Sequence, residues 1–240
     1  MESQNLRRVT GYVIVESPLE PLGLPDSPVK VVSMQMAASK VLGNRVGGLQ
    51  KYAIAFASLT ALIPTGVSFE EAATVSITAT TSLAAFHALS LPWPTISSRR
   101  ELDEQVLVWG GGSGVGMTSI AFLHLAGYKN IITTAAIKRE AELKSIGATV
   151  VIDHRDEAVV EKLTDVLHGN MLSKAIDAVT KEGTTESIAQ VMKNGGKIAR
   201  VSSLNPATKG NEGIEMLGID CTMFHDASYT SSSMYVIESC

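Results

Sequence analysis

Short apolar runs and amphipathic segments alternate along the second half of the chain. The apolar runs have strand length, and the segments between them carry apolar residues at helical spacing. The predicted strands cover residues 105–109, 130–134, 149–152, 174–179 and 197–201. The predicted helices cover residues 114–126, 138–146, 157–167 and 185–192. This alternation predicts βαβ units, and therefore an α/β fold with a Rossmann-type, doubly wound parallel sheet.

Four glycines stand where these predicted helices should end. Gly127, Gly147, Gly169 and Gly195 each follow a helix-like segment. Glycine is the residue that most often takes the left-handed conformation just after a helix. We therefore expect each of the four at a helix C-terminus.

The first part of the chain predicts less regular structure. Prolines interrupt any long element within residues 1–42, at Pro18, Pro21, Pro25 and Pro28. Residues 9–15 and 29–32 are apolar enough for two short strands, and residues 49–57 for another. No chemistry is evident in this region.

A capping box predicts one helix ahead of the regular array. Ser68 and Glu71 have the spacing at which each side chain accepts a hydrogen bond from the other residue's backbone N–H. The helix is expected over residues 72–89. Pro92 and Pro94 would end it.

The composition limits the function without identifying it. Apolar residues make up 45% and charged residues 18% of the 240 residues, and the net charge is −4. This balance permits a sizeable core and disfavours nucleic acids and acidic membranes as partners. The two cysteines, Cys221 and Cys240, provide no disulfide framework. Without a signal-peptide pattern or an apolar run of about 18 residues, the protein is expected to be soluble and cytoplasmic.

A glycine-rich segment follows the first strand of the array. Residues 110–116 read Gly-Gly-Gly-Ser-Gly-Val-Gly and lead into the predicted helix 114–126. Glycines let the backbone approach a ligand closely, and a helix N-terminus offers free N–H groups to a phosphate. In doubly wound folds, this turn binds the pyrophosphate of a dinucleotide. The segment therefore predicts a nucleotide site.

The residues after the second strand indicate which nucleotide is bound. NAD-binding folds place an acid about 20 residues beyond the first glycine, where it binds the ribose 2′-hydroxyl. Residues 131–136 contain no acid, and Lys138 and Arg139 follow. Two cations without a carboxylate suit a 2′-phosphate, which predicts NADPH rather than NADH. Alternatively, both cations are solvated residues in the first turn of a helix, an end at which cations are not favoured.

Three other nucleotide-binding classes fit less well. Short-chain dehydrogenases share the spacing Gly110-x-x-x-Gly114-x-Gly116, but no tyrosine here has a lysine four residues later. A methyltransferase would carry an acid after the second strand. A P-loop would continue with Lys and Ser or Thr, whereas Met117 follows Gly116.

Several motifs occur in order between Gly43 and about Asp220. They are Gly43-Asn-Arg-Val-Gly-Gly, Ile63-Pro-Thr-Gly-Val-Ser-Phe-Glu-Glu-Ala-Ala-Thr, Phe86-His-Ala-Leu-Ser-Leu-Pro-Trp-Pro, Leu143-Lys-Ser-Ile-Gly-Ala, Ile152-Asp-His-Arg, Ala175-Ile-Asp-Ala-Val-Thr and Val201-Ser-Ser-Leu-Asn-Pro. In these motifs the chain resembles the medium-chain dehydrogenase/reductase superfamily. The resemblance is closest to the zinc-independent branch of quinone reductases and fungal trans-acting polyketide enoyl reductases.

The resemblance implies cofactor contacts at matching positions. The pyrophosphate would lie on Gly112, Ser113, Gly114 and Val115, and the 2′-phosphate region on Ala136, Ile137, Lys138 and Arg139. His154 would stack beside the adenosine, Leu204 and Asn205 would face the nicotinamide ribose, and Thr81 would lie near the nicotinamide. His154 and Thr81 also have a structural interpretation, as an exposed strand-end residue and as a packed helix residue.

The resemblance also implies a function and a domain division. The reaction would be NADPH-dependent reduction of an α,β-unsaturated thioester, with a polyketide synthase as the partner that carries the substrate. The alternatives are an NADPH:quinone reductase and a truncated nucleotide-binding protein without activity. Residues 1–70 would be an incomplete GroES-like barrel remnant of the substrate domain. Residues 71–240 would be an NADP-binding Rossmann domain that stops before its sixth strand and C-terminal return, in a monomer or a homodimer.

No residue is assigned as the proton donor. The histidines that come into question as bases are His87, His124, His168 and His225. The first two fall in predicted helices and are expected to be packed or surface residues. Asp153 and Asp177 end predicted strands at the ligand edge, and the resemblance implies that they are structural or backbone-positioning residues rather than catalytic acids. The chain shows no Cys/His spacing typical of zinc ligands, so no metal is expected.

Overall fold

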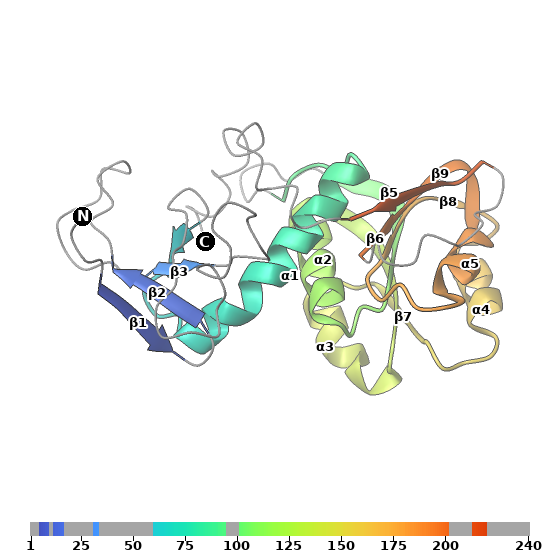
Figure 1. Ribbon diagram of the computed structural model, residues 1–240. Coiled ribbons are helices and arrows are strands. Elements are labelled where there is room, and N and C mark those ends of the chain that lie inside the picture. Colours follow the sequence, from blue (N-terminus) through green and yellow to red (C-terminus); the bar gives the residue numbers. More distant parts are fainter. Residues whose placement is uncertain are drawn as a thin grey trace. The chain divides into compact units, whose positions relative to one another are not determined.

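The computed structural model describes residues 5–9, 12–16, 31–33, 60–94, 101–201 and 213–219 (Figure 1). Contacts between residues divide the chain into two units, of which the second comprises Thr78–Cys221. The boundary falls within the helix α1 (Phe69–Ala88). The strand predicted over residues 49–57 lies outside the described residues.

The first unit contains a four-stranded antiparallel sheet in the order β1-β2-β3-β4. Its strands are β1 (Asn5–Val9), β2 (Tyr12–Glu16), β3 (Val31–Ser33) and β4 (Thr60–Leu62). The prediction of one strand over residues 9–15 is wrong, because Val9 pairs with Tyr12 across a reversal of the chain. Apolar residues stand on both sides of this reversal, so the hydrophobic pattern alone does not reveal it. The strand predicted over residues 29–32 overlaps β3.

The capping box at the start of α1 is confirmed. The Ser68 N–H donates to Glu71 Oε2 at 2.8 Å, and the Glu71 N–H donates to Ser68 Oγ at 3.2 Å. These bonds satisfy two of the N–H groups that a helix start leaves without intrahelical acceptors. They also lower the pKa of Glu71, the backbone bond contributing most.

The second unit is a parallel six-stranded sheet in the order β10-β9-β8-β5-β6-β7. Its strands are β5 (Leu102–Trp109), β6 (Tyr128–Ala135), β7 (Val150–Asp153), β8 (Leu172–Asp177), β9 (Met192–Arg200) and β10 (Glu215–Gly218). Its helical segments are α2 (Gly114–Leu125), η4 (Ile137–Arg139), α3 (Glu140–Ser145), α4 (Val159–Val166) and α5 (Thr184–Ala189). The predicted doubly wound α/β fold is confirmed.

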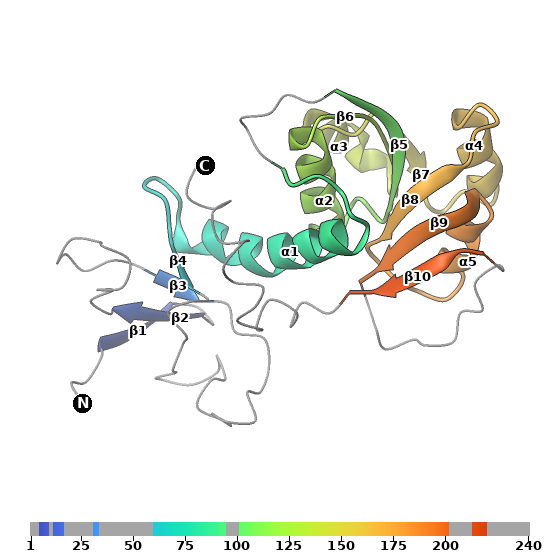
Figure 2. The same cartoon turned by 90° about the horizontal axis from the view of Figure 1, so that it is seen from above.

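Helices cover both faces of this sheet. The connections through α2 and α3 run from β5 toward β7, and the connection through α4 returns to β8 on the other side of β5. Right-handed crossovers therefore place α2 and α3 on one face, with α4 and α5 on the other (Figure 1). Figure 2 shows β8, β9 and β10 following one another across the sheet. The core is apolar, with Leu107, Ile132 and Ile198 almost fully buried.

The structure corrects three details of the prediction. Met192 begins β9 rather than ending a helix. Gly195 has a φ of +77° but lies inside β9, at an irregularity in its pairing with β8, and not at a helix end. The sixth strand, expected after Cys221, is β10, which pairs with β9. It is a short edge strand whose burial alternates little, which explains why the hydrophobic pattern did not predict it.

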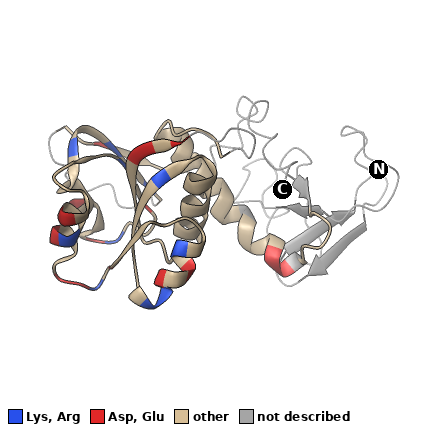
Figure 3. Cartoon of the chain, turned by 180° about the vertical axis from the view of Figure 1, so that it is seen from behind, with Lys and Arg blue, Asp and Glu red and all other residues tan. Residues whose placement is uncertain are grey.

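The surface of the described residues is mixed in charge. Figure 3 shows Lys and Arg interspersed with Asp and Glu along the helices and strands. Within this part of the chain, none of the helices combines the length and apolar character that crossing a membrane requires.

Candidate cofactor-binding site

The glycine-rich turn lies at the centre of the sheet's carboxyl edge. It connects β5 to α2, and β5 is flanked by β6 on one side and β8 on the other. The strand order reverses between β5 and β8, which makes this the topological switch point of the sheet. Doubly wound folds bind their ligands in the crevice at such a point.

Two glycines of the turn are required by close packing. A Cβ on Gly116 would lie 2.3 Å from the Gly110 carbonyl oxygen and 2.7 Å from the Gly111 Cα. A Cβ on Gly111 would lie 2.1 Å from Thr133 Oγ1. Contacts this short exclude any side chain, so these two residues let α2 approach β5 and β6. Gly112 differs, because the nearest atom to its Cβ position is Arg139 Nη1 at 3.4 Å.

Ser113 organises the N-terminus of α2. Its hydroxyl donates to the Gly110 carbonyl at 2.8 Å and accepts from the Gly116 N–H at 3.0 Å. Among the described residues, no acceptor is found for the N–H groups of Gly112, Gly114 and Val115. These three amides are therefore the groups that a phosphate at the helix N-terminus would bind.

Arg139 brings a positive charge to the turn. Its Nη1 donates to the Gly112 carbonyl, and its Nη2 contacts the sulfur of Met117 in α2 at 2.9 Å. Lys138 is exposed and has no ion pair with any of the described residues. Of the two predicted cations, the structure thus brings Arg139 to the turn and leaves Lys138 beside it on η4.

The other predicted site residues occupy different surroundings. Ala136 is half-buried and Ile137 is 50% exposed, both directly after β6. The side chain of His154 is exposed after β7, and its backbone N–H donates to the Ala135 carbonyl at 3.2 Å. Thr81 is buried in α1. Leu204 and Asn205 lie outside the described residues.

Thr81 belongs to a part of α1 that packs on the start of α2. One turn before it, Thr78 Cγ2 lies 2.8 Å from the position of a Cβ on Gly114. Ser82 donates to the Val115 carbonyl at 3.1 Å and accepts from the Ser119 hydroxyl at 3.0 Å. The α1 segment that carries Thr81 is therefore fixed against the first turn of α2.

Asp177 is held in place by the fold, in agreement with the structural role that the resemblance implies. Its fully buried carboxylate accepts bonds from the N–H groups of Val179 and Thr180, at 3.2 and 2.7 Å. It also accepts from the hydroxyls of Thr184 and Thr185, at 2.8 and 3.0 Å. Four donors hold this carboxylate, and its role is to fix the turn between β8 and α5.

The sequence analysis did not identify one polar residue near the glycine turn, Glu142. Glu142 in α3 accepts from Arg139 Nε at 2.7 Å and from Arg139 Nη2 at 2.9 Å. These bonds lower the pKa of Glu142 and raise that of Arg139. The i,i+3 spacing of the two residues was the available signal, since oppositely charged residues at this spacing meet on a helix surface.

A second polar cluster lies at the opposite, amino edge of the sheet. Glu104 in β5 accepts from the hydroxyl of Ser173 and from Lys174 Nζ at 3.2 Å. Partial burial raises the pKa of Glu104, but the bonds from Ser173 and Lys174 outweigh it and lower the pKa overall. Burial, the charge of Glu104 and a hydrogen bond to it raise the pKa of Tyr128 to about 12.

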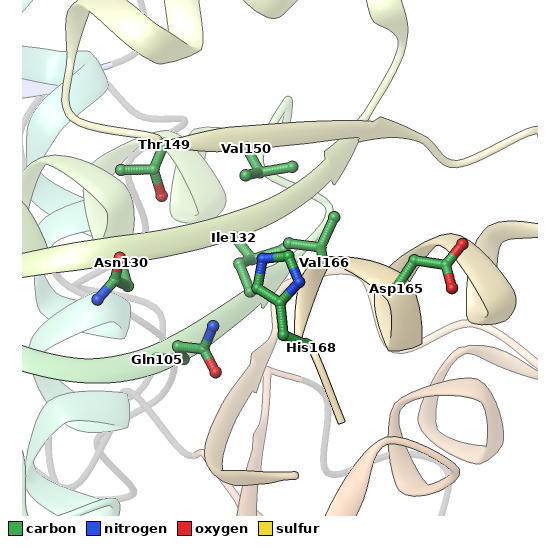
Figure 4. Close-up of a pocket in the computed structure, with 8 residues that line it drawn as sticks. All are labelled: Gln105, Asn130, Ile132, Thr149, Val150, Asp165, Val166 and His168. Atoms are coloured by element: carbon green, nitrogen blue, oxygen red, sulfur yellow. The ribbon is translucent and has the colours of Figure 1, made fainter. Parts of the chain in front are cut away.

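The amino edge also carries a cavity of about 430 Å³, beside the end of α4. Figure 4 shows the ring of His168 turned toward it and the carboxylate of Asp165 turned away. These two side chains therefore do not form an acid–base pair, and the cavity is at the far edge from the glycine turn. His87 and His124 are exposed on helices, as expected, and His225 lies outside the described residues. In the described part of the chain, no three His, Cys, Asp or Glu residues are grouped so that they could hold a metal.

Comparison with known proteins places this arrangement in a family. The family model described as zinc-binding dehydrogenase matches residues 114–239, more than half of the chain. A trans-enoyl reductase of Penicillium citrinum is 29% identical over 204 residues, covering 80% of this chain and 56% of that protein. The chain spans about half the length of the relatives it matches.

Solved structures share the fold. The CurK enoyl reductase superposes with a TM-score of 0.69 at 16% identity, over 92% of this chain and 63% of that one. An Escherichia coli quinone oxidoreductase, solved in complex with NADPH, superposes with a TM-score of 0.65 at 19% identity, over 89% and 63%. With its parallel sheet, its glycine turn and this family match, the chain belongs to the zinc-binding dehydrogenase family, within the medium-chain dehydrogenase/reductase superfamily.

Proposed function

We propose that this chain binds NADPH at the glycine turn and reduces the activated double bond of an α,β-unsaturated, carrier-bound thioester. A single observation carries the cofactor preference. The edge of the sheet after β6 has no acid at the ribose position, and it places Arg139 against Gly112 instead. A guanidinium binds a 2′-phosphate, whereas a carboxylate there would repel it.

The described residues fit such a cofactor. The N–H groups of Gly112, Gly114 and Val115 would bind the pyrophosphate, with Ser113 holding the turn in shape. Ala136, Ile137, Lys138 and Arg139 would surround the 2′-phosphate. His154 would lie beside the adenosine, and Thr81 would lie near the nicotinamide. Leu204 and Asn205, which lie outside the described residues, would face the nicotinamide ribose.

The chemistry proposed for the site is reduction by two electrons. When bound, NADPH supplies a hydride for the β-carbon of the thioester, and the α-carbon gains a proton. We assign no described side chain as the donor of that proton. The role of the chain is to bind and orient the cofactor at the switch point of the sheet.

The substrate class and the partner follow from the relatives. The names of several relatives identify them as trans-enoyl reductases, and the Penicillium citrinum protein is one of them. We therefore propose a polyketide synthase as the partner that presents the thioester. Residues 71–240 would form the NADP-binding domain, and residues 1–70 would contribute to a substrate domain.

The test is oxidation of NADPH by the full chain, followed by absorbance, with a crotonyl thioester and separately with a quinone. Turnover of the thioester supports the proposal. Turnover of the quinone alone would favour a quinone reductase, a function that the likeness to the Escherichia coli enzyme also suggests. Binding of NADPH without turnover of the thioester or the quinone would mean that this chain is a nucleotide-binding protein without reductase activity. A tighter affinity for NADH than for NADPH would overturn the assignment of NADPH as the cofactor.

A further inference from the structure

Both edges of the Arg139 guanidinium group that present two parallel N–H groups already have partners. The edge formed by Nε and Nη2 faces the carboxylate of Glu142, at 2.7 and 2.9 Å. The other edge faces the turn, through Nη1 on the Gly112 carbonyl and Nη2 near Met117. An incoming phosphate that binds this guanidinium through two parallel N–H groups must therefore displace one of these partners.

The partners differ in charge. Gly112 and Met117 offer a neutral carbonyl and a thioether, while Glu142 offers a full negative charge in a two-pronged contact. A guanidinium binds a phosphate through the same pair of parallel N–H groups that it uses for a carboxylate. Glu142 thus holds one of the two edges through which Arg139 can make a two-pronged contact with a phosphate. The bond from Arg139 lowers the pKa of Glu142, so this carboxylate is ionised at neutral pH.

Both side chains are open to solvent. The Arg139 side chain is 30% exposed and that of Glu142 is 47% exposed. Glu142 can therefore release Arg139 into water without the large penalty of uncovering a buried charge. A contact of this kind is weak enough to be exchanged for a phosphate and strong enough to reduce the phosphate's affinity.

We propose that Glu142 competes with the 2′-phosphate of the cofactor for Arg139 and thereby limits the preference for NADPH over NADH. This inference rests on the proposed binding of NADPH at the turn. Glu142 is then a specificity-determining residue. It contacts Arg139, which binds the cofactor, and does not contact the cofactor itself. NADH lacks the 2′-phosphate, so Glu142 has little effect on NADH.

The experiment is a fluorescence titration of the full chain with NADPH and with NADH. Glu142→Gln keeps the shape of the side chain and removes its charge, and should bind NADPH roughly threefold to fivefold more tightly, the range of an exposed ion pair. The affinity for NADH should stay within about twofold. In an Arg139→Ala background, Glu142→Gln should leave the NADPH affinity unchanged, because the competition needs the guanidinium.

Glu140→Gln is the matched control. Glu140 lies on the same helix and pairs with Lys144 at 2.7 Å, so this variant removes an equal charge without touching Arg139. The inference is overturned if Glu140→Gln has the same effect, if Glu142→Gln weakens NADPH, or if it strengthens NADPH and NADH alike. If the wild type binds NADPH and Glu142→Gln does not differ from it, only this inference fails. If neither protein binds NADPH, the proposed function fails with it.

Discussion

The two edges of the parallel sheet differ in whether their polar groups find hydrogen-bond partners within the fold. At the amino edge, Glu104 is surrounded by donors from Ser173, Lys174 and Tyr128, and its hydrogen-bonding capacity is used within the fold. At the carboxyl edge, the N–H groups of Gly112 and Val115 find no acceptor among the described residues. One edge is satisfied by the protein itself, and the other leaves donors for a ligand.

Charge alone does not distinguish the two edges. Both contain an exposed or half-exposed carboxylate bonded to a cation, Glu142 with Arg139 and Glu104 with Lys174. The difference lies in the backbone, because glycines at the carboxyl edge bring amides to the surface where side chains would otherwise cover them. A ligand site in this fold is therefore recognised by its free amides, and a charged cluster is not sufficient evidence of one.

Among the substitutions that test this difference between the edges, Gly116→Ala should have the largest effect on stability and cofactor binding. The new Cβ would meet the Gly110 carbonyl oxygen at 2.3 Å and the Gly111 Cα at 2.7 Å, and these backbone atoms cannot rotate away. We expect the free energy of unfolding to fall by about 2–3 kcal/mol, as for other overpacked sites, together with a loss of NADPH binding. Urea denaturation and a cofactor titration measure the two effects.

Gly112→Ala is the control for that variant. The nearest atom to its new Cβ would be Arg139 Nη1, the end of a flexible side chain, at 3.4 Å, and Arg139 Cδ and Ala135 Cβ would lie at the ordinary contact distances of 3.7 and 3.8 Å. Its stability should therefore stay within about 0.5 kcal/mol of the wild type, while NADPH binding weakens because the methyl group covers the turn. Equal stability of Gly116→Ala and Gly112→Ala would contradict the packing described for the turn.

A smaller effect is expected at the amino edge. Glu104→Ala removes the acceptor of Tyr128, Ser173 and Lys174, and Tyr128 is almost fully buried. The free energy of unfolding should fall by about 1–2 kcal/mol, with no change in NADPH affinity. Asp103→Ala, whose side chain is 86% exposed, should alter neither quantity. A loss of cofactor affinity in Glu104→Ala would show that the two edges are not independent.

The last effect is seen only at alkaline pH. The pKa of Tyr128 is about 12 in the folded chain, against 10.0 for an ordinary tyrosine. The folded state therefore holds this proton more tightly than the unfolded state. The resulting stabilisation is complete below pH 10 and is lost as the pH rises from 10 toward 12.

Tyr128→Phe tests this dependence. Its free energy of unfolding should fall less steeply between pH 10 and 12 than that of the wild type, because the group that titrates is gone. Ultraviolet titration of phenolate should also lose a step near pH 12. Identical alkaline slopes in the two proteins would mean that Tyr128 titrates normally.

Much of the second unit could be predicted from the sequence because its helices and strands are determined by residues close to one another in the chain. The five predicted strands correspond to β5–β9, and the spacing of Ser68 and Glu71 predicted the start of α1. Gly127 and Gly147 follow α2 and α3 with positive φ, as glycines after a helix do. Hydrophobic periodicity, capping residues and glycines carry this information within a few residues of one another.

The missed features depend on distant residues. Glu104 and Lys174 are 70 positions apart in sequence, and only the pairing of β5 with β8 brings them together. The same holds for the contacts of Arg139 at the turn, since Gly112 and Met117 are 27 and 22 positions away from it in sequence. The glycine turn was predictable as a motif, and the i,i+3 spacing of Arg139 and Glu142 was a local signal that the sequence analysis did not use.

The contact of α1 with α2 has a consequence for synthesis of the chain on the ribosome. Ser82 and Ser119 are 37 residues apart, and Phe86 packs edge-to-face on Phe122 with ring centroids 6.2 Å apart. The partners of α1 therefore emerge well after α1 itself. Until then, its apolar side chains are available to other nascent chains and to chaperones. The helix that comes first in this unit therefore cannot pack until α2 has been synthesised.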